Sequence, residues 1–241
     1  MDWGFHMKAT SIFPYVLLSA AFACSSVQAS VVTVFGTDLS FTYDDATSFG
    51  SAIVVGNSLT FSPTNFKAES LNGQGTVSSN VSLNVDVSVL AGHNYAIDKV
   101  QVAEQGDYKL LGSTASVAVG GALTLISYTK TDPNNFGSPY SSINTFNAGS
   151  LTQQGGPTAW SASAIADMNG QLGWQTDTHL IVKLENLLSA TTLSGDQQAF
   201  VEKKISGVGL QFVSVVPVPV PAAAWLMGSA LLGLFGIRTR R

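Results

Sequence analysis

The fold class is decided by the stretch Val81-Ser82-Leu83-Asn84-Val85-Asp86-Val87-Ser88-Val89, along which apolar and polar residues alternate without a break. Successive side chains of a β-strand point to opposite faces of the sheet, so this alternation predicts a strand with one buried and one solvated face. Shorter pieces of the same kind predict further strands at residues 96–103, 115–119, 122–129, 180–185 and 208–216.

Glycine-rich reversals separate these segments. Asn72-Gly73 and Gly106-Asp107 are typical of tight turns, and Gly120-Gly121 is interpreted as the loop of a hairpin over residues 116–124. Residues 132–155 are rich in Asn, Ser, Gly and Pro and are interpreted as one long loop. Residues 159–168 fit a strand or a short helix, and we favour the strand because serines weaken a helix there. The sequence thus predicts an all-β domain, an antiparallel β-sandwich such as a jelly roll or a related architecture.

Composition excludes several classes of protein. Only 11% of the 241 residues are charged and 45% are hydrophobic, which excludes an intrinsically disordered chain. One cysteine excludes a disulfide framework and a cysteine-rich metal module. Residues 30–216 hold 7 Lys, no Arg and 14 Asp plus Glu, a net charge of −7, so we expect no binding of nucleic acid. Because the same negative charge would repel an acidic polysaccharide, we expect a neutral glycan or a matrix protein to be the more favourable binding partner.

The first residues carry the pattern of an export signal. Lys8 precedes an apolar run at residues 12–23, and small residues follow up to Ala29. This predicts a signal peptide over residues 1–29, which the Sec translocon would receive and signal peptidase would cut between Ala29 and Ser30. We expect translation to start at Met7. A short membrane anchor is the alternative, although a run of about 12 residues falls short of the roughly 20 that a bilayer needs.

The last residues predict a membrane span. Residues 215–237 carry no charge, and Arg238, Arg240 and Arg241 follow them. The run is long enough to cross a bilayer as one helix, and the arginines would stay on the cytoplasmic side and stop translocation. Trp225 lies near the outer end, where an indole suits the interface. A buried core helix is the alternative, but it gives no reason for three terminal arginines.

The tail Val216-Pro217-Val218-Pro219-Val220-Pro221-Ala222-Ala223-Ala224-Trp225-Leu226, with its helix and arginines, resembles a PEP-CTERM sorting signal. The resemblance covers about the last 26 residues. It implies that an exosortase, a membrane cysteine transpeptidase-like enzyme, recognises and cuts the tail. The sorting residues that it implies are Pro219, Val220, Pro221, Ala222 and Trp225. Val220 stands where the name-giving motif has Glu, as in related tails that read Val-Pro-hydrophobic-Pro-Ala-Ala-Ala-Trp-Leu.

The resemblance implies an exported Gram-negative protein with an ectodomain at residues 30–214 and a sorting signal at residues 215–241. Its expected role is structural or adhesive, in the envelope or in an exopolysaccharide matrix such as that of a biofilm. The stretches Glu104-Gln105-Gly106-Asp107-Tyr108 and Ala199-Phe200-Val201-Glu202-Lys203-Lys204 resemble parts of β-rich ectodomains that carry such tails. The alternative is a surface protein that binds or hydrolyses glycans through dispersed carboxylates.

No motif in the sequence predicts catalysis, a cofactor or a metal site. His93 and His179 have no neighbour at ligand spacing, and nucleophile elbows, zinc-protease motifs and phosphate loops are missing. We therefore expect no enzyme. Three acidic groups could offer oxygen ligands to calcium, but turn residues that bond their own backbone are the favoured interpretation. These groups are Asp44-Asp45, Glu104 with Asp107, and Asp132 with Asn134 and Asn135.

Aromatic residues gather in and beside the polar region after residue 132. Exposed rings there could stack on sugars, whereas buried rings would fill the core of a sandwich, and we favour the core. The residues concerned are Phe136, Tyr140, Phe146, Trp160 and Trp174.

Overall fold

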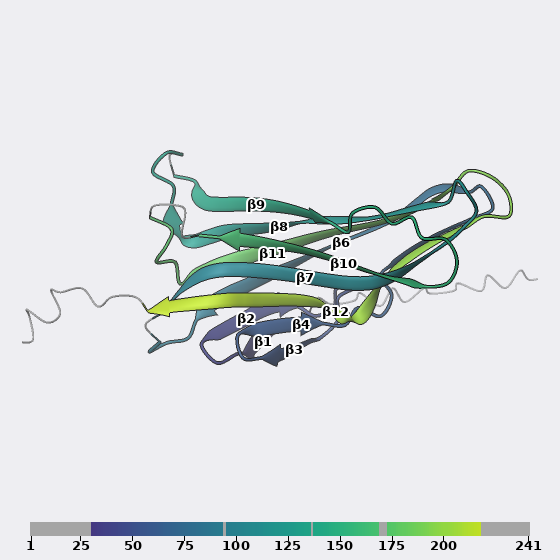
Figure 1. Ribbon diagram of the computed structural model, residues 1–241. Coiled ribbons are helices and arrows are strands. Elements are labelled where there is room, and N and C mark those ends of the chain that lie inside the picture. Colours follow the sequence, from purple (N-terminus) through teal and green to yellow (C-terminus); the bar gives the residue numbers. More distant parts are fainter. Residues whose placement is uncertain (1–29, 94, 136, 169–172, 218–241) are drawn as a thin grey trace, which may run out of the picture.

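The structure, a computed structural model, describes residues 30–217 except residues 94, 136 and 169–172 (Figure 1). Strands make up the regular secondary structure of this part, and they confirm the predicted all-β class. They are β1 (Val31–Phe35), β2 (Leu39–Asp44), β3 (Ala52–Val55), β4 (Ser58–Phe61), β5 (Lys67–Leu71), β6 (Gly75–Val89), β7 (Tyr95–Leu111), β8 (Ser116–Thr131), β9 (Pro139–Asn147), β10 (Thr158–Asp167), β11 (His179–Thr192) and β12 (Gln198–Pro217).

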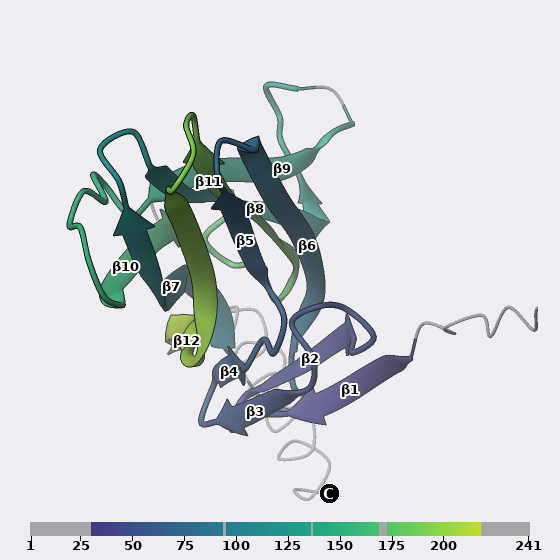
Figure 2. The same ribbon diagram turned by 90° about the vertical axis from the view of Figure 1, so that its right-hand side faces the viewer.

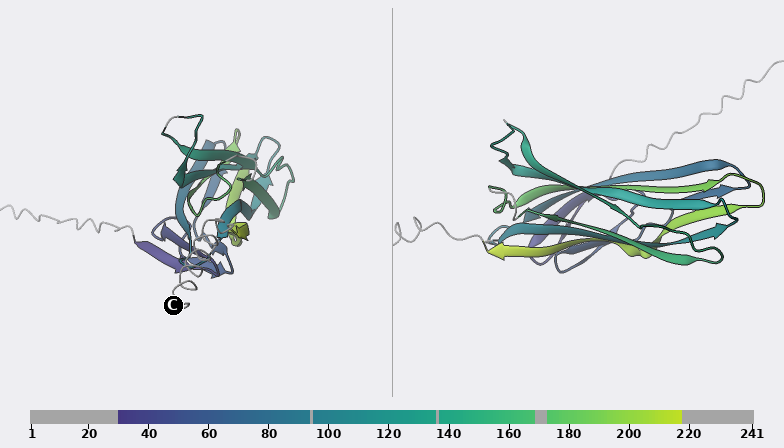
Figure 3. Two further views of the ribbon diagram at one scale, coloured as in Figure 1. Left: turned by 90° about the vertical axis from the view of Figure 1, so that its left-hand side faces the viewer. Right: turned by 45° about the horizontal axis from the view of Figure 1, so that its top comes forward.

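The strands form two antiparallel sheets that face each other along an elongated body (Figures 1 and 3). The first sheet has the order β1-β2-β6-β11-β8-β9. The second sheet has the order β10-β7-β12-β4-β3, and β5 also pairs with β12. The consecutive strands β11 and β12 therefore belong to different sheets, so the short connection between them crosses from one layer to the other.

The core lies between the two sheets and follows the predicted alternation. In β6 the side chains of Leu83, Val85 and Val87 are buried, and the polar residues between them face outward. Burial of each such side chain contributes about 1.5–3 kcal/mol. Aromatic rings extend the core toward β4, where the ring centroids of Tyr43 and Phe61 lie 5.1 Å apart in an edge-to-face contact.

Two predicted turns are wrong. Gly120-Gly121 lies inside β8, which runs on from Ser116 to Thr131, so the hairpin over residues 116–124 does not form. Gly106-Asp107 likewise lies inside β7. Neither pair needs a positive φ here, because ladder partners on both sides hold these glycines in extended backbone. Asn72-Gly73 is a turn, as predicted, with φ of 51° and 79° between β5 and β6.

The long loop predicted at residues 132–155 is also wrong, because it contains the edge strand β9. Tyr140 and Phe146 turn inward from this strand, while its Ser and Asn side chains stay at or near the surface. Polar residues suit an edge strand, whose second side faces water. The strand favoured at residues 159–168 is confirmed by β10, although the last of these residues, Met168, follows the strand.

Candidate functional site

Most of the predicted sorting residues lie outside the part of the chain that the structure describes. Ser30 is described and exposed, directly before β1. Outside lie Ala29, Pro219, Val220, Pro221, Ala222, Trp225, Arg238, Arg240 and Arg241, together with the predicted signal peptide and C-terminal helix. Among the described residues, the structure contains no helix long and apolar enough to cross a membrane.

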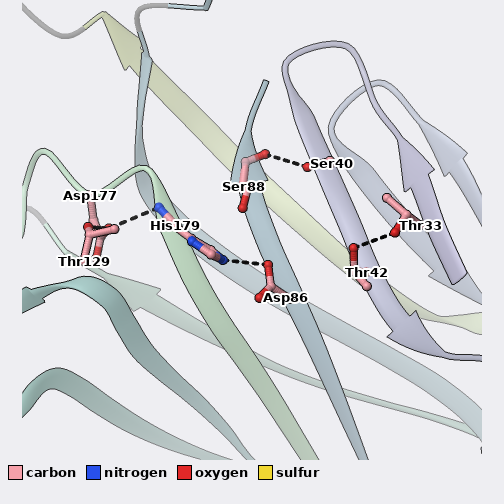
Figure 4. A network of polar contacts seen from close by, with 8 residues as sticks. All are labelled: Thr33, Ser40, Thr42, Asp86, Ser88, Thr129, Asp177 and His179. Carbon is pink, nitrogen blue, oxygen red and sulfur yellow. Dashed lines mark hydrogen bonds and ion pairs between the residues drawn. The ribbon is translucent and has the colours of Figure 1, made fainter. Parts of the chain in front are cut away.

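Both histidines singled out in the sequence pair with single carboxylates. His93 Nδ1 lies 3.0 Å from Asp38 Oδ1, and His179 Nε2 lies 2.8 Å from Asp86 Oδ1 (Figure 4). The His179 ring also stacks on Tyr128 with 4.2 Å between centroids. Within residues 30–217, gaps excepted, no three His, Cys, Asp or Glu side chains group as ligands for a metal.

The acidic groups considered for calcium act on their own backbone or lie apart. Asp44 Oδ1 accepts a hydrogen bond from the amide of Ala46 at 2.9 Å, and Asp132 Oδ1 accepts one from Asn134 at 2.8 Å. The turn interpretation is therefore confirmed for these two residues. Glu104 is buried, whereas Asp107 lies three positions along the same strand and faces outward, so the two carboxylates do not share a site.

Asp177 is the centre of a buried hydrogen-bond network that the sequence did not reveal. Its carboxylate accepts hydrogen bonds from the Ser127 hydroxyl, from Thr129 Oγ1 at 2.9 Å, from Trp174 Nε1 at 3.0 Å and from the His179 amide at 3.1 Å (Figure 4). Each carboxylate oxygen accepts two of these hydrogen bonds, so no lone pair is left to bind a ligand. The network holds the start of β11 against the end of β8.

The aromatic residues fill the core, which confirms the favoured interpretation for the four that are described. Trp174 is fully buried, and its ring stacks on Tyr140 with 5.6 Å between centroids. Phe146 and Trp160 are buried as well. The alternative interpretation, in which these rings are exposed and stack on sugars, is therefore wrong for the four described residues. Phe136 lies outside the described residues.

A hollow of about 250 Å³ on the outer face of the second sheet gathers three carboxylates, Glu69, Asp107 and Glu202. Lys204 Nζ lies 2.8 Å from Asp107 Oδ2 and 3.2 Å from Glu202 Oε1. Hydrogen bonds to these two partners raise the pKa of Lys204. The lysine thus pairs with two of the three carboxyl groups in the hollow.

The most unusual arrangement is a cluster of Lys203, Glu104 and Asn186 between the sheets. Lys203 comes from β12, Glu104 from β7 and Asn186 from β11, and at most 3% of each residue is exposed. Lys203 Nζ contacts both Glu104 Oε2 and Asn186 Oδ1. Within the described part of the chain, the remaining atoms Glu104 Oε1 and Asn186 Nδ2 have no hydrogen-bond partner.

Aromatic rings and glycines enclose this buried cluster from both sheets. In the second sheet Gly106 pairs with Trp160 on one side and with Lys203 on the other. In the first sheet Gly121 pairs with Phe146 on one side and with Asn186 on the other. A Cβ atom on Gly106 would lie 2.6 Å from the Trp160 ring, and one on Gly121 would lie 2.5 Å from the Phe146 ring. The two glycines therefore leave room for the rings beside the cluster, and the rings help to exclude water from it.

Burial changes the acidity of both charged groups in the cluster. Desolvation lowers the pKa of Lys203 to about 8, although the negative charge of Glu104 opposes the shift. Desolvation also raises the pKa of Glu104 against the opposing charge of Lys203. Both shifts favour the neutral forms, an amine and a carboxylic acid, over the ion pair.

One feature of the sequence, the position of Lys203 in the alternating pattern, could have indicated this cluster. Ala199 and Val201 face inward in β12, and Lys203 has the same phase, so a lysine occupies a position where the pattern calls for an apolar residue. The two stretches compared with other ectodomains also lie side by side, because Val201 pairs with Tyr108 and Glu202 with Asp107. The third member, Asn186, is brought in from the other sheet by the fold alone.

Comparison with known proteins gives no family. No family model and no curated protein matches the chain. Among solved structures, two chains match, and one of them belongs to "Structure of infectious bursal disease virus Gt strain". That match has 13% identity and a TM-score of 0.17, and it covers 73% of this chain and 46% of the viral chain. At that TM-score the likeness carries no argument about fold or function.

Proposed function

We propose that the protein is exported and serves as a structural or adhesive component of the cell surface or of an exopolysaccharide matrix. Its two ends support export, through the signal-peptide pattern before Ser30 and the PEP-CTERM-like tail at residues 215–241. In this proposal the β-sandwich-like ectodomain is the working part. The C-terminal helix holds the chain in the inner membrane until an exosortase acts on it.

The observation that carries the adhesive role is an apolar surface on two edge strands. Val31 and Phe35 of β1 are 70% and 67% exposed, and Ile53 and Val55 of β3 are 64% and 69% exposed. Both strands lie at one border of the body (Figure 2), and the segments that follow them meet where the Thr37 amide donates a hydrogen bond to Gly56 O at 3.0 Å. Exposed apolar edge strands are sites where another chain can pair or pack. A matrix protein suits this surface better than a charged polymer does.

The test is to follow the protein in its native host by cell fractionation and by mass spectrometry of its termini. We expect the chain to begin at Ser30 and to be found at the surface or in the matrix. The double variant Phe35→Ser/Val55→Ser should be exported normally but lost from the matrix to the medium. Ile143→Ser is the matched control, because Ile143 is 69% exposed on the opposite edge strand β9. A cytoplasmic chain with its N-terminus intact would refute the proposal, as would equal retention of both variants.

The tail has its own test in the same experiment. Replacing Arg238, Arg240 and Arg241 by Ser removes the positive charge that keeps the end of the chain in the cytoplasm. We expect less retention in the membrane and less processing by the exosortase. If membrane retention and processing are the same as in the wild type, the tail is not a sorting tag. The proposed adhesive role of the ectodomain would then rest on the apolar surface alone.

A glycan-directed role is the second candidate, and the hollow with three carboxylates is the observation that favours it. Phe200 also lines this hollow and could contact a sugar ring. Because Asp107 and Glu202 are already paired with Lys204, the arrangement suits hydrogen bonding to sugar hydroxyls better than acid catalysis. Binding of the ectodomain to neutral polysaccharide, lost in Glu202→Gln, would support this candidate.

A further inference from the structure

We propose that Lys203 and Asn186 become joined by an intramolecular isopeptide bond, with Glu104 as the residue that moves the proton. The bond would connect Nζ of Lys203 on β12 to Cγ of Asn186 on β11 and would tie the two sheets together covalently. This inference concerns the ectodomain alone and does not depend on export or on the tail.

The position of the two side chains supports the bond. Lys203 Nζ contacts Asn186 Oδ1, and this oxygen is bonded to Cγ, so the nitrogen lies next to the carbon that it would attack. Three different strands hold the three side chains, and the core leaves them no room to move apart. Groups held in such contact react far faster than in free solution, with effective molarities of about 10⁵–10⁸ M for well-oriented pairs.

The protonation state of the pair also supports the bond. Attack on an amide carbon requires a neutral amine, because an ammonium group has no electron pair to give. Burial lowers the pKa of Lys203 and raises that of Glu104, so transfer of a proton from the lysine to the glutamate costs less free energy here than in water. The contact between Nζ and Glu104 Oε2 provides the path for that transfer.

The reaction balances without any other reactant. The Nζ electron pair forms a bond to Cγ, and the carbonyl electrons move onto Oδ1. Glu104 takes the two protons that Nζ must lose, one after the other, and passes both to Nδ2, the Cγ–Nδ2 bond breaks, and the carbonyl re-forms as ammonium leaves. Within the described residues, Glu104 Oε1 and Asn186 Nδ2 have no other partner, so nothing competes for the acid or for the leaving group. Glutamate is regenerated, and nothing is oxidised or reduced.

The surroundings of the cluster exclude water. Lys203 Nζ lies 5.5 Å from the centroid of Phe66 and 5.9 Å from that of Trp160. Gly106 and Gly121 let Trp160 and Phe146 close over the cluster from the two sheets. Water would otherwise solvate the amine and hydrolyse the intermediate. The unpartnered amide nitrogen of Asn186 does not stabilise an ion pair between Lys203 and Glu104. In the proposed reaction this nitrogen is the leaving group, so each of the three side chains has a role.

The experiment is mass spectrometry of the full chain, purified and digested with trypsin. The bond removes one ammonia, so the intact protein should weigh about 17 Da less than its sequence requires. Lys203 would carry an acyl group and resist trypsin, which should release residues 184–204 as one peptide with that same deficit. Fragmentation should yield no backbone ions between Asn186 and Lys203, because both ends of that segment stay joined.

Matched variants separate the bond from other losses of ammonia. Lys203→Arg, Asn186→Ala and Glu104→Gln should each have the full mass of its sequence, and trypsin, which cleaves after Lys and Arg, should cut all three after residue 203. Lys204→Arg places the same substitution one residue away, on an exposed side chain, and should still show the deficit. Wild-type protein of full mass that is cut after Lys203 would overturn the proposal even if every variant misfolded. A 17 Da deficit with normal cleavage after Lys203 would also overturn it, because it would mean a succinimide.

Discussion

Gly106 allows a sharp test of how the core is built around the buried lysine. A methyl group added by Gly106→Ala would lie 2.0 Å from the carbonyl oxygen of Glu202 and 2.6 Å from two carbon atoms of the Trp160 ring. Ordinary van der Waals contact begins at 3.4 Å, so the ring and the backbone must each retreat by about an ångström.

The expected cost follows from these contacts. Overpacking of this kind destabilises a protein by about 1–3 kcal/mol. The shift would also break the hydrogen bond from Trp160 Nε1 to Glu202 O, now 3.2 Å long, at a further cost of about 1 kcal/mol. We therefore expect Gly106→Ala to lose about 2–4 kcal/mol, which for a chain of this size lowers the melting temperature by roughly 5–15 °C.

Differential scanning calorimetry of the purified protein measures this change. Gly156→Ala is the matched control, because a Cβ atom on Gly156 would meet nothing within 4 Å and its φ is not positive. The control should melt within about 2 °C of wild type. If Gly106→Ala also melts within that interval, the ring does not lie against this glycine, and the account of the enclosed cluster is wrong.

Two more predictions concern buried charges. Asp177→Ala should lower the free energy of unfolding, measured by urea denaturation, by about 3–5 kcal/mol, because Ser127 and Trp174 lose their buried hydrogen-bond acceptor. The control Asp132→Ala removes one exposed hydrogen bond in a turn and should lower it by about 1 kcal/mol or less. The variant Asn186→Ala cannot form the isopeptide bond, so its Lys203 can still titrate. The pKa of this lysine is about 8 in the folded protein and 10.5 in the unfolded chain, so between these two pH values the unfolded chain binds the proton and the folded protein does not. The free energy of unfolding should therefore rise from pH 8 to 10.5 relative to Asn186→Ala/Lys203→Met, and a flat difference would contradict the shift.

The alternation of residues 81–89 was enough to predict the fold class, because a half-buried strand imposes its period on the sequence directly. Glycine pairs misled the prediction in β7 and β8. A glycine can permit a turn, but it can equally make room for a ring across the strand, as Gly106 does for Trp160 and Gly121 does for Phe146. Sequence alone does not separate these uses, since the ring that needs the space lies 54 residues away in one case and 25 in the other.

The buried cluster was beyond prediction for a related reason. Lys203 and Glu104 are 99 positions apart, and the phase of β12 hints only that this lysine faces inward. Which asparagine it meets depends on how the two sheets are stacked, and that arrangement comes from the packing of the whole core. The export and sorting residues are predicted by the opposite route, from short contiguous patterns that can be recognised without a fold, and they stay predictions.

The place of β12 has a consequence for the timing of folding. It is the last strand of the domain, yet it lies in the middle of its sheet, between β7 on one side and β4 and β5 on the other. Until residues 198–217 arrive, β7 and β4 have no common neighbour, and the second sheet cannot form. A chain that emerges from a narrow channel, first residue first, therefore stays unfolded until nearly all of this domain has passed through.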